Sequence, residues 1–154
     1  MNLDEQRLHG DLVKLAGSLR GRQLLQLAVR GIARGDRDVA AGCWVKRGDA
    51  GCLFQHAYWE GVRDGIFADA GRPGDWIGNF VGSSDYGIVI RVIASFDRLA
   101  KSTYSDIEPR TLLPDRARLR QGDWNGAVER MLLDVLGDDD GGELRPRTPV
   151  PAIA

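Results

Sequence analysis

The segment 83–102, "SSDYGIVIRVIASFDRLAKS", restricts the fold more than any other part of the chain. Its apolar residues recur at intervals of three and four, the spacing that places side chains on one face of a helix. That face carries Ile88, Val89, Val92, Ile93, Phe96, Leu99 and Ala100. The β-branched run "GIVIRVI" leaves a buried strand over 86–93 as the alternative. The periodicity favours a long amphipathic helix.

Shorter segments elsewhere repeat the helical pattern. Helices are expected over 3–20, 22–34, 50–68, 75–82 and 124–136, with short ones after Asp36 and near 114–121. Four of these helices are expected to start at a Gly-Asp pair, namely 35–36, 48–49, 74–75 and 122–123, because Asp can cap a helix. We therefore predict an all-α fold, a single compact domain of about six or seven helices over 1–137, followed by a disordered Asp/Gly/Pro-rich tail over 138–154.

The segment 50–68 is apolar on nearly every side, which is typical of a helix at the centre of its domain. Ala57, Gly61 and Gly65 recur every four residues. Glycine costs about 1 kcal/mol against alanine within a helix, so a close approach of another backbone should offset that cost. The expected partner is the helix over 84–101, and the core is expected to form around these two helices.

Charge and hydropathy exclude several classes of protein. The 154 residues carry a formal charge of −1, which gives no general attraction to nucleic acid or to an anionic membrane. No apolar run approaches the roughly 20 residues of a membrane span. The N-terminal "MNLDEQRLHG" lacks the basic start and apolar block of a signal peptide. A cytoplasmic protein with reduced cysteines and no membrane contact is expected.

Two groups of arginines could contact phosphate. They are Arg110, Arg116, Arg118 and Arg120, and Arg20, Arg22, Arg30, Arg34 and Arg37. Acidic residues alternate with both groups, and neither contains interleaved aromatic residues or a recognition-helix pattern. The sequence therefore argues against nucleic acid as a partner.

The stretch "GDAGCLFQHAYWEG" (48–61) is a candidate thiol site. With Asp49 as the helix cap, Cys52 would occupy the third helical position, where backbone N–H groups stabilise a thiolate. His56, one turn later, could take its proton, and Glu60 could orient the imidazole. No second catalytic motif supports this hypothesis. The alternative is that Cys52 is a small core residue and His56 a buried, hydrogen-bonded one.

A metal site would use the same residues. Cys43, Cys52 and His56 with either His9 or Glu60 would supply four zinc ligands by type. The spacing C-x8-C-x3-H is not one of the familiar structural zinc patterns. We therefore expect neither a metal nor another cofactor, and the pattern argues against an enzyme.

Leu8, Leu12, Leu15 and Leu19 form a narrow apolar seam on the helix expected over 3–20. This seam could bind a protein partner or a second copy of the chain as a homodimer, or it could dock onto its own domain. The alternative function is an apolar ligand pocket lined by Trp44, Trp59 and Phe67. The sequence thus favours a non-catalytic protein that acts by protein–protein binding or self-association.

Overall fold

The computed structural model describes residues 2–42, 50–69, 72–103 and 121–137. These residues form an all-α domain of six helices with one small sheet. The helices are α1 (Leu3–Leu15), α2 (Leu19–Ala33), α3 (Leu53–Arg63), α4 (Pro73–Val81), α5 (Ser83–Thr103) and α6 (Gln121–Leu136). The strands are β1 (Asp38–Val39) and β2 (Ala50–Gly51). The helix expected near 114–121 lies almost entirely outside the described residues, and the tail over 138–154 lies wholly outside them.

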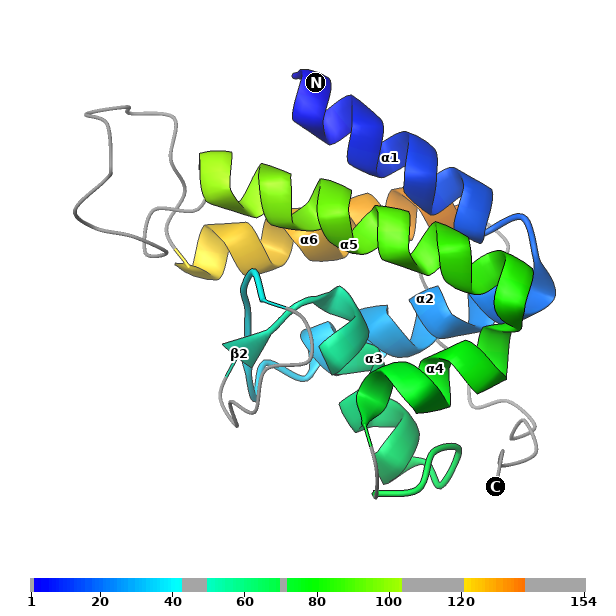
Figure 1. Cartoon of the computed structure of the whole chain (residues 1–154). Helices are drawn as coiled ribbons and strands as arrows, with labels where there is room; N and C mark the ends of the chain where they lie inside the picture. The colour runs from blue at the N-terminus through cyan, green and yellow to red at the C-terminus, as the bar shows by residue number, and fades with distance from the viewer. Residues whose placement is uncertain (1, 43–49, 70–71, 104–120, 138–154) are drawn as a thin grey trace.

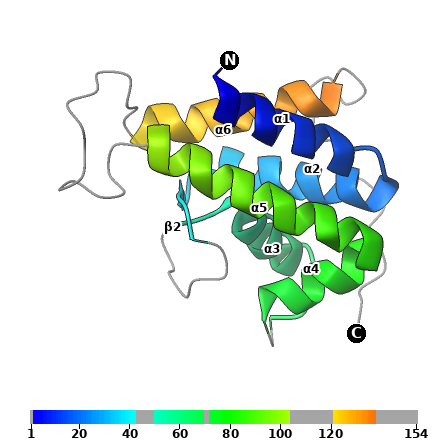
Figure 2. The same cartoon turned by 45° about the horizontal axis from the view of Figure 1, so that its top comes forward.

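The predicted helix over 83–102 is confirmed as α5, and the strand alternative over 86–93 is wrong. Its residues Val89, Val92 and Phe96 are fully buried. Figure 1 shows α1, α5 and α6 above α2, with α3 and α4 below it. In Figure 2, α5 runs in front of α2 from the end of α4 to the start of α6. The core extends across all six helices. The all-α prediction is therefore confirmed.

The helix predicted over 3–20 is wrong, because the chain turns between α1 and α2. Asn2 and Glu5 form a reciprocal capping box at the start of α1. Ser18 then caps α2, its hydroxyl accepting a hydrogen bond from the N–H of Gly21 at 3.0 Å. At Gly21 an added Cβ would lie 2.0 Å from the carbonyl oxygen of Leu15. The turn therefore depends on a serine cap and on a residue without a side chain.

The Gly-Asp pairs do not act as predicted. At α4 and α6 the aspartates Asp75 and Asp123 lie in the first turn and do not occupy the N-cap position. Gly35 and Asp36 precede β1, where a short helix was expected. Asp49 lies outside the described residues. Aspartates in the first turn still interact favourably with the helix dipole. Helices therefore do begin near two of the four Gly-Asp pairs, at α4 and α6.

The main partner of α3 is α2, and the predicted packing of α3 against the helix over 84–101 is wrong. An added Cβ at Gly31 of α2 would lie 2.7 Å from the carbonyl oxygen of His56. Gly61 provides space for the ring of Phe67 and allows no close helix approach, and Gly65 lies beyond the end of α3 with φ of 75°. The glycine that brings two helices together is thus on α2.

The small parallel sheet is fixed by the start of α6. Asp38 pairs with Ala50, and Val39 pairs with Gly51. The side chain of Asn125 accepts a hydrogen bond from the N–H of Val39 at 2.9 Å, and Gln121 donates to the carbonyl of Val39 at 2.9 Å. These bonds hold the segment after α2 against α3 and α6.

Candidate functional site

Two pairs of opposite charges join α2 to α3. The guanidinium of Arg34 donates to both carboxylate oxygens of Glu60, from Nε at 2.6 Å and from Nη2 at 2.9 Å. Arg30, one turn earlier, donates to Asp64 at 2.6 Å and lies 3.4 Å from Glu60. The four residues thus form one network in which Glu60 contacts both arginines.

Glu60 is the buried member of this network. Its side chain is 2% exposed, whereas that of Arg34 is 35% exposed. An unpaired carboxylate would be costly at such a position, so the bidentate contact with Arg34 offsets the cost of burying Glu60. The hydrogen bond to Glu60 is the largest cause that raises the pKa of Arg34 above its usual value, and burial opposes it.

A cleft of about 360 Å³ opens over this network. It is lined by Gly31, Arg34, Asp36, Arg37, His56, Tyr58, Trp59, Glu60, Val62, Arg63 and Asp69. The volume is within the range of pockets that bind small molecules. Three arginines and three acidic residues contribute, so the cleft carries charges of both signs.

Aromatic rings flank the charged groups. The guanidinium carbon of Arg37 lies 4.2 Å from the centroid of the Trp59 ring, a cation–π contact. The edge of the His56 ring meets Trp59, with centroids 5.3 Å apart and planes at 85°. Tyr58 donates its hydroxyl to the carbonyl of Ala68 at 3.0 Å, and burial raises its pKa. The cleft therefore combines a half-buried indole with adjacent guanidinium groups.

His56 holds β1 against α3. Its Nε2 lies 2.9 Å from the carbonyl oxygen of Asp38, so this nitrogen must be the protonated donor. The imidazole is fully buried. Burial is the main cause that lowers the pKa of His56, and the charge of Arg37 lowers it further, while the hydrogen bond to Asp38 opposes both. A neutral imidazole at pH 7 follows.

We predict that His56 makes the protein less stable in mild acid. The unfolded chain takes up a proton on this residue near pH 6.5, whereas the folded chain resists it. The stability that neutral His56 contributes is thus fully present above pH 6.5. It is lost as the pH falls from there through the lower pKa of the folded state. Urea unfolding at about pH 7.5 and about pH 5.5 should show a larger loss in the wild type than in His56→Gln.

The control for this prediction is His9→Gln, since His9 is less buried and lies beside Asp134 on the surface. The loss of stability between the two pH values should be reduced more by His56→Gln than by this control. An equal loss in wild type and His56→Gln would contradict the assignment.

The predicted Cys52–His56–Glu60 constellation does not assemble. Cys52 is the N-cap of α3 and not its third helical residue, and its sulfur is disulfide-bonded, which corrects the expected free thiol. His56 bonds to Asp38, and Glu60 bonds to Arg34. Cys43, the other cysteine, lies outside the described residues. The buried, hydrogen-bonded alternative for His56 is confirmed.

The described ranges also contain no cluster of side chains that could bind a metal ion. Within them, no three His, Cys, Asp or Glu side chains converge as ligands for an ion. His9 is on α1 and lies 3.4 Å from Asp134 of α6, whereas His56 is buried and bonded to Asp38.

The predicted apolar pocket is only partly formed. Trp59 lines the cleft, but Phe67 does not, because its ring stacks on Tyr58 and packs beneath Gly61. Trp44 lies outside the described residues. Charged residues line the cavity beside Trp59, and the apolar pocket of the three residues stays a prediction.

The leucine seam does not form a surface. Leu8, Leu12 and Leu15 are buried in the core of the domain, with Leu12 only 1% exposed. Leu19 is 71% exposed and begins α2, so it does not share their face. Leu8, Leu12 and Leu15 thus pack within the chain. This is the alternative in which the seam docks onto its own domain.

Several cleft residues were missed from the sequence, notably Asp36, Tyr58, Arg63 and Asp69. A signal was present: Arg30 and Arg34 are spaced by four on one helix, as are Glu60 and Asp64 on the next. Such matching pairs of opposite sign on consecutive helices indicate a shared face. Asp36 and Asp69 come from the segments that follow α2 and α3, and no periodicity marks them.

No protein-family model, curated protein or solved structure matches the chain significantly. Of the helices in the described segments, none combines the length and apolar character needed to cross a bilayer.

Proposed function

We propose that the protein binds a small zwitterionic molecule, without catalysis, in the cleft between α2 and α3. The supporting observation is that guanidinium and carboxylate groups line one cleft of about 360 Å³ beside the indole of Trp59. A ligand that carries both a carboxylate and an ammonium group can satisfy both signs. A singly charged ligand would leave one set unpaired.

The arginines suit the carboxylate of such a ligand. Arg34 donates two N–H groups to the buried carboxylate of Glu60. The part of Arg34 that remains exposed lines the cleft. Arg37 contributes a second guanidinium against Trp59. Planar guanidinium groups bind carboxylates in a bidentate manner, which favours a carboxylate over a neutral carbonyl.

The acidic residues suit the ammonium group. Asp36 and Asp69 are exposed at the cleft and form no ion pair with any described residue. Asp69 is close enough to Tyr58 for its charge to help raise the pKa of the phenol. Trp59 offers apolar area to a side chain on the ligand, as aromatic residues do in most small-molecule sites.

L-phenylalanine and two of its derivatives test this proposal. Phenylalanine amide lacks the carboxylate, and N-acetylphenylalanine lacks the ammonium group. Isothermal titration or NMR titration should show the parent compound binding about tenfold more tightly than either derivative, since one charge-assisted hydrogen bond contributes about 1.5 kcal/mol.

Matched variants separate the two ends of the ligand. Arg37→Gln should remove the preference for phenylalanine over its amide, and Asp69→Asn should remove the preference over the N-acetyl derivative. Arg98→Gln on α5 is the control and should bind all three as the wild type does. Equal binding of the three compounds, or equal effects of Arg37→Gln and Arg98→Gln, would contradict the proposal.

Binding to another protein or to a second copy of the chain, expected from the sequence, also remains a proposal. Its support has moved from the leucine seam to exposed apolar side chains such as Leu3, Leu19 and Ile90. Sedimentation of wild type against Leu19→Asp tests it. A monomeric wild type at high concentration would contradict self-association.

A cytoplasmic location is likewise a proposal. It rests on the composition. The disulfide at Cys52 counts against it, because disulfides are rare where thiols are kept reduced.

A further inference from the structure

Helices α1 and α5 run antiparallel, with a polar line of contacts between them. The hydroxyl of Ser95 donates to Asp11 at 2.6 Å, whereas that of Ser102 donates to the carbonyl of Leu99 at 3.0 Å and lies 3.4 Å from Asp4. Asp11 is therefore engaged in the junction between the helices, and Asp4 lies at its edge.

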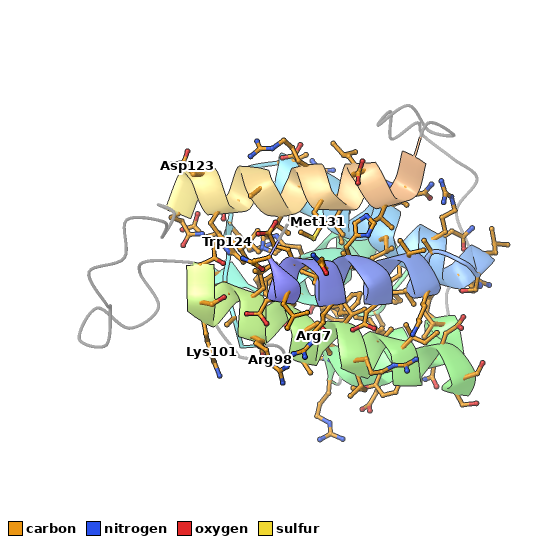
Figure 3. All side chains as sticks on the ribbon, turned by 90° about the horizontal axis from the view of Figure 1, so that it is seen from above. Arg7, Arg98, Lys101, Asp123, Trp124 and Met131 are labelled. Atoms are coloured by element: carbon orange, nitrogen blue, oxygen red, sulfur yellow. The ribbon has the colours of Figure 1, made fainter. Side chains whose placement is uncertain are left out.

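Five basic residues flank this junction, and all five are exposed. They are Arg7 and Lys14 of α1, and Arg91, Arg98 and Lys101 of α5. Figure 3 places Arg7 where α1 meets α5, with Arg98 and Lys101 along α5. The spacing of seven from Arg7 to Lys14 is two turns, or about 10.5 Å along the helix. Arg91 and Arg98 repeat that spacing on α5. We call these five residues the α1–α5 basic face.

None of the five is engaged by another described residue in a hydrogen bond or an ion pair. This distinguishes them from Arg30 and Arg34, whose charges are taken up by Asp64 and Glu60. The two helices also carry five acidic residues, but each of these is only partly exposed, so the basic residues are their most exposed charges. The five acidic residues are Asp4, Glu5, Asp11, Asp85 and Asp97.

We propose that the α1–α5 basic face binds the phosphate backbone of double-stranded nucleic acid without sequence preference. Phosphate contacts require basic side chains at intervals along a surface and need no apolar centre. A protein partner would need such a centre, whereas the large apolar side chains exposed on α1 and α5 in the described segments are scattered. They are Leu3, Val13 and Ile90, and Leu3 and Val13 are ten residues, or about 15 Å, apart along α1. Single strands would need exposed aromatic rings for stacking, whereas the aromatic residues of α5 are partly or fully buried.

The sequence argued against nucleic acid as a partner, but that argument considered only arginines that lie close together along the chain. The basic face joins residues from the first helix and the fifth, and only their packing brings them together. The nucleic-acid proposal goes beyond the cleft proposal, because the basic face and the cleft share no residue. Experiments can therefore contradict one proposal without contradicting the other.

A fluorescently labelled duplex of about 20 base pairs, titrated with the full chain, tests the proposal by anisotropy. Five phosphate contacts predict a slope of about −4.5 for the logarithm of the association constant against that of salt concentration. Arg98→Gln should weaken binding about eightfold at about 0.1 M salt and reduce the magnitude of the slope by about 0.9.

Arg72→Gln is the matched control, because Arg72 is also exposed but lies at the start of α4. It should leave affinity and slope unchanged, and circular dichroism should show both variants folded. Absence of binding at about 50 mM salt, or equal losses in the two variants, would overturn the proposal. Equal affinity for poly-L-glutamate or for phosphatidylserine vesicles would overturn the assignment to nucleic acid.

Discussion

Leu12→Asp is expected to unfold the protein, whereas Leu19→Asp should leave it folded. Leu12 is 1% exposed inside the core, and a carboxylate there would have no partner. The cost should be at least about 4 kcal/mol, a large share of the stability of an ordinary domain. Leu19 is 71% exposed, so the same change there meets water. Circular dichroism and urea unfolding of the two variants measure the difference.

This pair is informative because both leucines belong to the seam that the sequence predicts. If the seam were a partner surface on a continuous helix over 3–20, both substitutions would abolish association and neither would unfold the monomer. A folded, stable Leu12→Asp would therefore contradict the packing of α1 described here.

Arg34→Met is expected to destabilise the protein by about 3 kcal/mol. The substitution keeps the unbranched stem of the side chain but removes the guanidinium and both of its hydrogen bonds to the buried carboxylate of Glu60. Losing one partner of a buried pair typically costs about 3–5 kcal/mol, and the lower end applies because Arg34 is partly exposed and Arg30 remains near Glu60. Urea unfolding near pH 7 measures the change in the free energy of unfolding.

The double variant Arg34→Met with Glu60→Met completes a thermodynamic cycle. Removing the carboxylate as well should recover most of the lost stability, because no charge is left buried. Arg72→Met, whose partner Asp75 is exposed, is the control and should change stability by less than about 1 kcal/mol. Additive effects of the two cleft substitutions would show that the residues do not interact.

The long helices could be predicted from sequence because their patterns are local. Phe96 and Val92 recur with helical spacing, and burial of that face alone is enough to place α5 in the core. The periodicity over 124–136 likewise located most of α6. Such patterns depend on the sequence within one segment and require no knowledge of its neighbours.

The breaks between elements were harder to predict. The apolar spacing runs past Leu15 to Leu19, so it hides a turn that depends on the serine cap at Ser18. The sheet of β1 and β2 is held by Gln121 and Asn125, which are far along the chain. Two-residue strands of this kind are fixed by tertiary contacts and carry too few residues for a periodic signal.

The cleft could be predicted only in part. His56, Trp59 and Glu60 were singled out from one helix, but their roles depend on what the neighbouring segments supply. Arg34 pairs with Glu60 only because Gly31 lets α2 approach α3 closely. Sequence spacing within α3 could indicate a special segment, but it could not show which residue each side chain would contact.

Intermolecular nuclear Overhauser effects between bound L-phenylalanine and the protein test the central claim, that the cleft between α2 and α3 binds a zwitterion. The account predicts contacts from the ligand ring protons to the indole of Trp59 and none to that of Trp76, which lies on α4 outside the cleft. Contacts to Trp76 or to α1 and α5 in place of Trp59, or no contacts at saturating ligand, would contradict it.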